Sequence, residues 1–348
     1  MSIIINLLLF ILILGFIVFV HEAGHFIFAK MNGVYVYEFS IGMGPILFKK
    51  QGKETLYSIR VIPIGGFCQL AGEDLGEDDK NKVPKEKRLQ NKAPWQRFLI
   101  MFFGAGNNFI SAFLILLLIG SIWGASSLRP IINYVDPNSA SYNAGLRNGD
   151  LIKEIDDKKI DTSDDITLNL ALSKHKKPTK FLVIRDNGKS AALVFVNPHK
   201  TKNGYVYGIG VGEKGGSGLV NGFKYATLKF KSIYKQMYVT IGSLINGDVK
   251  FTDLSGPVGI YSVVGQQRKA GFVNILYLVA FLSINVGFMN LLPLPAMDGG
   301  HIIFIFIEMI VGHPVNSDVE NKIHFVGLLI LFTLMIFVTV MDIVKIFM

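Results

Sequence analysis

The chain has 348 residues, half of them hydrophobic, with a mean hydropathy of +0.42. That is too apolar for an ordinary water-soluble protein and predicts a polytopic membrane protein with a polar insert. The net charge of +9 indicates basic loops near anionic lipid, since no basic motif interleaved with aromatic residues suggests nucleic-acid binding. The single cysteine, Cys68, excludes an internal disulfide and a cysteine-built zinc site, so any metal must rest on His, Asp or Glu.

Four apolar stretches are long enough to cross a bilayer as helices, which takes about 20 residues each. They lie at residues 3–28, 98–123, 273–292 and 324–342. The first is expected to be a retained span and not a signal peptide, because residues 1–20 carry no charge and no small-residue cleavage site ends the run. A shorter apolar piece at residues 301–311 is interpreted as a partial or re-entrant segment.

Polar regions separate the spans. Residues 34–70 alternate apolar and polar side chains around the turn signal Gln51-Gly52-Lys53, which predicts a β-hairpin or small sheet. Residues 72–91 are dense in charge and predict a solvated, mobile loop. Residues 221–247 carry aromatic and basic side chains at helical spacing, which predicts an amphipathic helix at the membrane surface.

A soluble block at residues 126–198 combines short β runs with a helix-like stretch near residues 165–173. Its segment NAGLRNGDLI, at residues 143–152, closely resembles the AGL-x-x-GD-x-I signature of PDZ domains. Gly145 and Gly149 are expected at turns that need unusual backbone angles. The predicted fold is therefore a polytopic α-helical membrane protein with about four transmembrane helices, a membrane-associated β-hairpin and one inserted PDZ domain.

Loop charge predicts the topology. The first loop holds most of the basic side chains near the spans, among them Lys30, Lys92 and Arg97, while the N-terminal tail has none. The positive-inside rule then places the first loop in the cytoplasm, with the N-terminus and the PDZ-like block outside. The expected segments are a first span (1–30), a cytoplasmic hairpin and charged loop (31–95), a second span (96–124), an extracytoplasmic PDZ domain (125–200), a linker with an amphipathic helix (201–270), a third span with a broken segment (271–312) and a fourth span (313–348).

The sequence HEAGH, at residues 21–25, lies inside the first predicted span. Residues four apart on a helix share one face, so His21 and His25 can hold one Zn²⁺, and Glu22 can act as general base. In a soluble chain an exposed polar helix face would explain the pattern about as well. Inside an apolar helix each ionisable group costs about 2.5–3.5 kcal/mol, and a bound metal explains that cost best.

Catalytic zinc keeps three protein ligands, so a third is required. Phe28 and Met31 occupy the positions where a metzincin would continue with Gly and His, and Glu38 lies in a strand-like stretch past the helix. Asp298 is the better candidate, because two prolines in NLLPLPAMDGG (290–300) break the third span, and broken backbone at membrane depth must be buried or line a wet cavity. The alternative, that Asp298 caps an interfacial turn, accounts for these residues equally well.

Together, HEAGH and the NxxPxPxxDGG segment resemble the site-2 protease family over almost the whole chain, and the PDZ-like block fits its RseP/RasP-like branch. Further matching pieces are SIGMGP (40–45), PIGGF (63–67) and SGPVGI (255–260). Met297 stands where the family usually has Leu, which is a conservative change. Family members often carry a second PDZ domain, and this chain has room for only one.

The resemblance implies an intramembrane zinc metalloendopeptidase in a bacterial inner or plasma membrane. Its substrates would be single-span membrane proteins, such as anti-sigma factors or remnant signal peptides, cut within their transmembrane segments. It implies that the active site faces the cytoplasmic side. The implied site residues are zinc ligands at His21, His25 and Asp298, a catalytic base at Glu22, and substrate contacts at Asn290, Pro293 and Pro295.

Two other functions fit parts of the pattern. Intramembrane His, Glu and Asp can relay protons or metal ions in a transporter, but paired half-repeats are missing from the sequence. A catalytically idle membrane scaffold would be expected to carry a damaged motif, and this one is intact. Among the remaining polar residues, interhelical hydrogen bonds are expected for Asn107, Asn108 and Asn285, a place near the metal is possible for His301, and structural or surface roles are expected for His175, His199, His313 and His324.

Overall fold

The apolar runs fold into long helices, because a chain in lipid must pair every backbone group within the segment itself. The computed structural model describes residues 2–73, 83–124, 126–173, 177–185, 190–201, 204–249, 252 and 254–347, and in this part of the chain four helices are long and apolar enough to cross a membrane. They are α1 (Ser2–Met31), α2 (Pro94–Ile119, continued by a π-helical turn at Gly120–Gly124), α7 (Phe272–Leu291) and α9 (Ser317–Phe347). All four predicted spans are confirmed as helices, and α9 extends well beyond residues 324–342.

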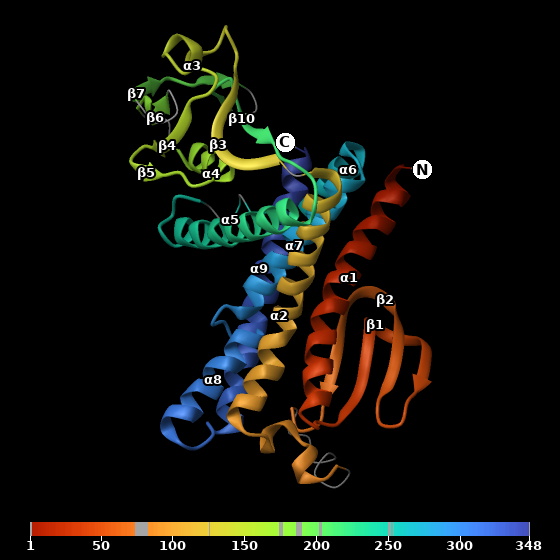
Figure 1. Cartoon of the computed structure of the whole chain (residues 1–348). Coiled ribbons are helices and arrows are strands. Elements are labelled where there is room, and N and C mark those ends of the chain that lie inside the picture. The colour runs from red at the N-terminus through yellow and green to blue at the C-terminus, as the bar shows by residue number, and fades with distance from the viewer. Residues whose placement is uncertain are drawn as a thin grey trace. The chain divides into compact units, whose positions relative to one another are not determined.

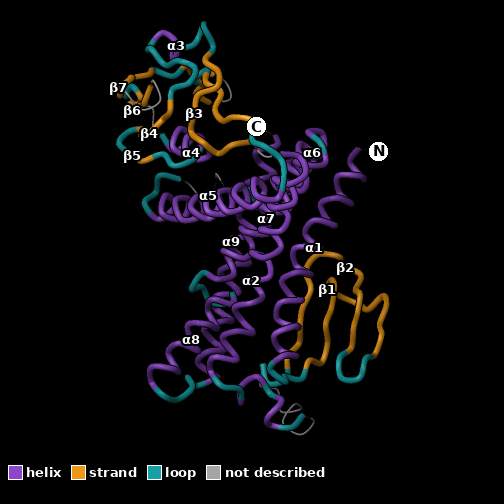
Figure 2. The backbone as a smooth tube through the Cα atoms, in the orientation of Figure 1, coloured by secondary structure: helices purple, strands orange, loops and turns teal. Residues whose placement is uncertain are grey.

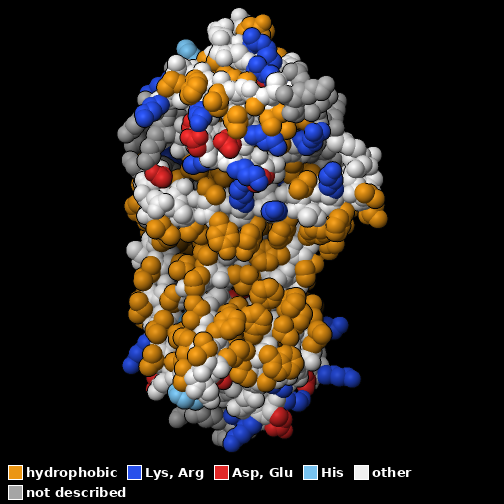
Figure 3. All heavy atoms as spheres, turned by 60° about the vertical axis from the view of Figure 1, so that its left-hand side comes forward, with side chains coloured by type: hydrophobic (Ala, Val, Ile, Leu, Met, Phe, Trp, Pro, Cys, Tyr) orange, Lys and Arg blue, Asp and Glu red, His pale blue; other side chains and the backbone are white. Residues whose placement is uncertain are grey.

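The chain divides into two units, Met1–Ile115 with Phe251–Met348, and Leu116–Lys250. In the first unit α1 packs through Phe10, Ile13 and Ile17 against Val264 and Leu278. The opposite side of α1 stays exposed, with Leu12 at 67%. Such a helix, apolar on every side, is expected where lipid covers what protein does not. Figure 3 shows a face on which hydrophobic side chains form a broad, nearly continuous cover.

The predicted hairpin is present as β1 (Val36–Gln51) and β2 (Leu56–Leu70), which pair antiparallel. Ile41 pairs with both Ile59 and Gly66, so the hairpin folds back on itself into a small sheet beside α1 (Figures 1 and 2). Apolar side chains on the part of the sheet farthest along β1 are exposed, with Leu47 at 68% and Phe48 at 64%. The sheet lies beside α1, and its place in the cytoplasm stays a prediction.

The hairpin turn is fixed to the end of α1 by charge. Glu54 accepts hydrogen bonds from Lys87 at 2.8 Å and from Lys30 at 2.9 Å. These two ammonium groups lower the pKa of Glu54 to about 2. Both lysines belong to the basic set that the topology prediction used, so part of that charge is neutralised by a local partner.

The loop at residues 72–91 was predicted to be solvated and mobile; residues 74–82 lie outside the described residues, and in the rest Val83, Arg88 and Leu89 are buried. Residues 83–91 form two short 3₁₀ helices, Lys85–Lys87 and Leu89–Asn91. The Leu89 amide donates to the Ala71 carbonyl at 2.7 Å, and the Leu89 side chain joins the core beside Ala29. One well-placed leucine anchors the segment, which a charge count over the whole loop does not reveal.

Helix α6 (Pro257–Ala270) lies in the predicted linker and was not anticipated. Its proline stands in the first turn, where the missing amide hydrogen costs nothing. The buried Asp342 of α9 accepts hydrogen bonds from the Gly256 and Gly259 amides, both at 2.8 Å. The SGPVGI segment is thus a helix start whose cap comes from a residue far along the chain. The remaining helix of this unit is α8 (Asp298–Val311).

The second unit contains a six-stranded sheet with the order β10-β3-β4-β6-β7, and β5 pairs with β4. Its strands are β3 (Ser126–Val135), β4 (Leu151–Ile155), β5 (Lys158–Lys159), β6 (Thr179–Arg185), β7 (Ser190–Val196) and β10 (Ile209–Lys214). Two short strands, β8 (His199–Thr201) and β9 (Gly204–Val206), form a separate hairpin. The sheet therefore continues past the predicted domain boundary at residue 200, because β10 pairs antiparallel with β3.

The helices of this unit are α3 (Ala140–Asn143), α4 (Ser163–Leu172) and α5 (Leu219–Ile245), so the helices expected near residues 165–173 and 221–247 are both present. A capping box between Thr162 and Asp165 starts α4. Gly145 and Gly149 have φ values of +102° and +90°, as their turn positions predicted. His175 lies outside the described residues.

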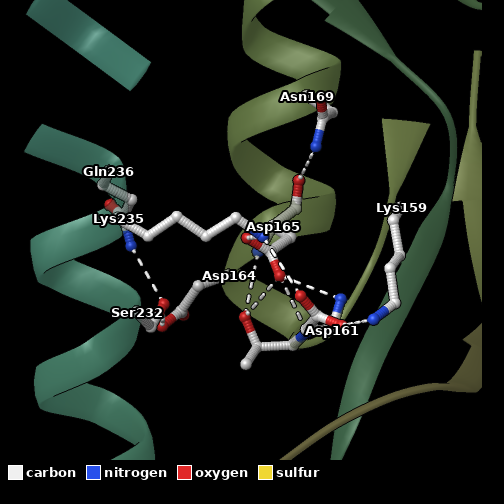
Figure 4. Close-up of polar contacts among 9 residues, drawn as sticks. Lys159, Asp161, Asp164, Asp165, Asn169, Ser232, Lys235 and Gln236 are labelled. Atoms are coloured by element: carbon white, nitrogen blue, oxygen red, sulfur yellow. Dashed lines mark hydrogen bonds and ion pairs between the residues drawn. The ribbon is translucent and has the colours of Figure 1, made fainter. Parts of the chain in front are cut away.

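Helix α4 is joined to α5 by ion pairs (Figure 4). Lys229 donates to both carboxylate oxygens of Asp164, at 2.8 and 2.7 Å, and Ser232 donates to Asp164 at 2.8 Å. Lys235 lies 2.9 Å from Asp165, whose other oxygen belongs to the capping box. We call this group the α4–α5 latch. Lys229, Ser232 and Asp165 are the most buried members of this latch, which attaches α4 and the six-stranded sheet, together called the sheet domain, to α5.

Candidate active site

Three potential metal ligands meet in the first unit. His21 and His25 lie on consecutive turns of α1, and Asp298 is the first residue of α8. The two Nε2 atoms are 3.3 Å apart, and Asp298 Oδ2 lies 3.3 Å from His21 Nε2 and 3.5 Å from His25 Nε2. All three residues are largely shielded from solvent. The structure thus brings together residues that are far apart in sequence.

The triangle fits a single tetrahedral ion. Ligand bonds of about 2.0–2.2 Å place neighbouring ligand atoms roughly 3.4 Å apart, and the three observed distances lie close to that value. Asp298 Oδ2 is also a buried oxygen without a hydrogen bond, which a protein rarely leaves uncompensated. A cation at the centre of the triangle would satisfy all three atoms.

The far side of each imidazole is held by a polar partner. His25 Nδ1 donates to the Ile100 carbonyl at 2.9 Å, which leaves the Nε2 lone pair directed at the triangle. His21 Nδ1 lies 3.3 Å from the side-chain amide of Asn108, which is completely buried. The Asn108 atom that faces His21 Nδ1 is the amide nitrogen Nδ2, and turning the amide over would let its oxygen accept from Nδ1–H and leave Nε2 free for a metal. The sequence predicted only a generic interhelical bond for Asn108, and no pattern within α2 connects it to His21.

Two glycines allow α1 and α2 to approach this closely. A Cβ atom on Gly24 would lie 1.9 Å from the Phe103 carbonyl oxygen. A Cβ atom on Gly104 would lie 2.2 Å from His25 Nε2. Because real Cβ contacts begin beyond 3 Å, only glycine fits at either position without moving a helix or a ligand. Gly24 thus has a structural purpose within the HEAGH motif.

The break in the third span places Asp298 at the site. Helix α7 ends at Leu291, and α8 begins at Asp298 directly against the preceding loop. A Cβ atom on Gly299 would lie 2.1 Å from the Leu292 carbonyl oxygen, and one on Gly300 would lie 2.6 Å from that of Leu294. The two glycines after the acid therefore let α8 start tightly against the loop, and this packing aims the first side chain at α1.

A cavity of about 640 Å³ opens beside the triangle. Glu22 lines it, and the backbone amide of Cys68 in β2 interacts with the Glu22 carboxylate. Glu38, the local candidate ligand, is instead bound to Arg60, whose Nη2 donates to it at 2.7 Å. The cavity therefore combines the Glu22 carboxylate next to the triangle with the Glu38–Arg60 ion pair on the hairpin wall.

Only some of the other predicted site residues line this cavity. Asn290 and His301 line the cavity. Pro295 lies on the wall of a separate apolar cavity, and Pro293 lines neither. The expectation of interhelical bonding is wrong for Asn285, which donates to the Phe281 carbonyl of its own helix at 2.7 Å, whereas Asn107 reaches the Val20 carbonyl of α1 at 3.4 Å. His199 and His313 are exposed at the surface and His324 is packed against the loop before Asp298, and both outcomes agree with the surface or structural roles expected for them.

Comparison with known proteins agrees with this geometry. The family model for peptidase family M50 matches residues 9–334. The chain belongs to peptidase family M50, the site-2 protease family. The zinc metalloprotease RasP of Bacillus licheniformis is 32% identical, covering 97% of this chain and 98% of the relative. The regulator of sigma-W protease RasP of Bacillus subtilis is 31% identical, with the same two shares. A protein of Clostridium acetobutylicum, provisionally named as a zinc metalloprotease, is 35% identical over 97% of each chain.

Proposed function

We propose that this M50 peptidase is an intramembrane zinc metalloendopeptidase in which His21, His25 and Asp298 hold the zinc ion and Glu22 is the general base. The observation that carries the proposal is the near-equilateral triangle of ligand atoms, built from a membrane-spanning helix and a broken one. Neither an idle scaffold nor a transporter accounts as well for a buried three-ligand set beside a glutamate and a polar cavity.

The chain's own residues divide the chemistry among them. When bound, zinc acts as a Lewis acid toward the scissile carbonyl and makes water a nucleophile near neutral pH. Glu22, which lines the cavity next to the triangle, takes the proton of the attacking water and returns it to the leaving amine. The Ile100 carbonyl keeps His25 in the neutral tautomer that offers Nε2, and the Asn108 side chain contacts the far side of the His21 ring. The cavity admits water to a depth where lipid would otherwise exclude it.

A substrate helix must be unwound before its peptide bond is accessible. The β1–β2 sheet stands beside α1 and forms one wall of the cavity through Glu38, Arg60 and Phe67. An extended substrate segment can add to such a sheet as a further strand, and Asn290 lines the same cavity. Replacing Gln69 of β2 by Pro, with Gln69→Ala as its matched control, should reduce cleavage and leave zinc bound, because Gln69 lines the cavity. Unchanged cleavage in the proline variant would argue against strand addition.

The substrates in this proposal are single-span membrane proteins of a bacterial plasma or inner membrane, with anti-sigma factors and remnant signal peptides as the two classes. The name of the Bacillus subtilis relative, a regulator of sigma-W protease, supports the first class. The N-terminus and the sheet domain lie outside the cytoplasm, and the active site opens toward the cytoplasmic side.

The sheet domain is a PDZ domain that filters substrates by size or by a newly exposed chain end. The AGL-x-x-GD-x-I match and the left-handed Gly145 and Gly149 support this assignment. Because β10 completes the sheet, a test deletion must run from residue 126 to residue 214. Full-length, uncut substrates should then be cleaved. If substrate choice stays the same, the domain is not a filter.

The central test uses the full chain purified with and without Glu22→Gln. Bound zinc is measured by elemental analysis, and cleavage is measured on a single-span reporter. We expect about one zinc per chain in both proteins and cleavage only in the wild type. Asp298→Asn should lose zinc as well as activity. Equal cleavage by the wild type and Glu22→Gln would refute the assigned base, and full zinc content in Asp298→Asn would refute the third ligand.

A further inference from the structure

The loop that carries Asp298 is held by a side chain from α9. The loop contains two prolines, and Ala296 has a φ of +68°, a conformation unusual for a residue other than glycine. Its backbone N–H donates to His324 Nδ1 at 2.8 Å. An unpaired amide at this depth would cost several kcal/mol, so this bond stabilises a strained loop two residues before the ligand.

Packing fixes the position of the His324 ring. His301 of α8 stacks on it with centroids 3.9 Å apart and planes at 15°. A Cβ atom on Gly327, one turn further along α9, would lie 2.3 Å from Pro295 Cβ. Helix α9 therefore contacts the loop at two successive turns, once through a hydrogen bond and once through close backbone packing.

The same residues form a second cluster with metal-ligand chemistry, since ligand atoms of His301, Glu320 and His324 lie within 4.8 Å of one another. The bond from Ala296 argues against a metal there. A ring nitrogen that accepts a backbone N–H carries a lone pair, so in the neutral imidazole His324 Nε2 carries the proton. That Nε2 is buried without a hydrogen bond, 3.9 Å from the Glu320 carboxylate, and as an N–H it has no lone pair to offer a cation.

We propose that His324 is a positioning residue for the metal centre, which accepts the Ala296 amide and thereby aims Asp298 at His21 and His25. The inference rests on the proposed function, because it concerns the third zinc ligand. Its chemical requirement is a hydrogen-bond acceptor at the place of Nδ1 and not a charge. Asparagine can supply such an acceptor through its side-chain oxygen, whereas leucine has similar bulk and no acceptor.

The experiment compares the full-length wild type, His324→Leu and His324→Asn in detergent, with His313→Leu as a control at an exposed histidine. Zinc affinity is measured by competition with a chromogenic chelator, and amide hydrogen exchange of residues 294–298 is measured after zinc removal. His324→Leu should bind zinc about 10–100-fold more weakly, as expected for loss of a group that orients a ligand, and its loop amides should exchange faster. His324→Asn and His313→Leu should resemble the wild type.

Gly327→Ala provides a second variant, because it displaces Pro295 without changing the imidazole, and it too should weaken zinc binding. The proposal is overturned if His324→Leu keeps wild-type zinc affinity, or if asparagine is as harmful as leucine. Two zinc ions per wild-type chain, with one lost in His324→Leu, would show that the second cluster binds metal instead. Wild-type zinc affinity in Asp298→Asn would refute the proposed ligand set, whatever His324 does.

Discussion

Replacing Gly104 by alanine should disable the metal centre and leave the fold intact. The new Cβ atom would lie 2.2 Å from His25 Nε2, whereas ordinary contacts begin near 3.4 Å. The imidazole would have to move by about 1.2 Å. It cannot rotate freely, because its other nitrogen donates to the Ile100 carbonyl, a bond worth about 1 kcal/mol. A displacement of roughly 1 Å at a catalytic group can cost about 100-fold in rate.

Gly106 offers a matched control on the same helix. A Cβ atom there would meet a ring atom of Phe103 at 3.1 Å, and a small movement of that side chain can relieve the contact. Alanine also favours a helix over glycine by up to about 1 kcal/mol. We expect Gly106→Ala to melt at or above the wild-type temperature, with normal zinc content and cleavage.

The assay measures zinc affinity by chelator competition, reporter cleavage and thermal unfolding for wild type, Gly104→Ala and Gly106→Ala. Gly104→Ala should bind zinc at least about 10-fold more weakly, as expected for a displaced ligand, and cleave about 100-fold more slowly. Its unfolding temperature after zinc removal should remain close to that of the control. Wild-type zinc affinity in Gly104→Ala would refute the close approach of α2 to His25.

Three further changes test other parts of the structure. Asn108→Ala removes the side chain that contacts His21 and should weaken zinc binding about 10–100-fold in the same competition assay. Wild-type zinc affinity in this variant would show that His21 needs no such support. Asp342→Ala leaves two backbone amides at the start of α6 without their acceptor. It should lower the free energy of unfolding by about 3 kcal/mol or more, measured by thermal unfolding. No change in stability would show that the cap is dispensable. Lys229→Met leaves Asp164 without its main cation. The free energy of local unfolding of α4 should fall by about 3–5 kcal/mol, which is detected as faster hydrogen exchange in α4. Unchanged protection would mean that the latch does not hold α4 to α5.

The sequence by itself determined the spans, the hairpin, the zinc motif and the family. Local sequence patterns predict these features, because the period of apolar residues and the spacing of His21 and His25 depend only on helix and strand geometry. It also directed attention to Asp298, through the prolines that no ordinary span tolerates. At that stage the turn interpretation of Asp298 remained equally open.

Only the tertiary structure decided between them. Asp298 lies 3.3 Å from His21 because α8 starts against the Leu292 carbonyl, a contact that depends on how two helices meet. Asn108 and His324 likewise acquire roles through partners on other helices, and no periodicity within their own segments encodes those partners. Local patterns specify which chemical groups are present. The distances between those groups are set by packing, and a metal centre is defined by distances.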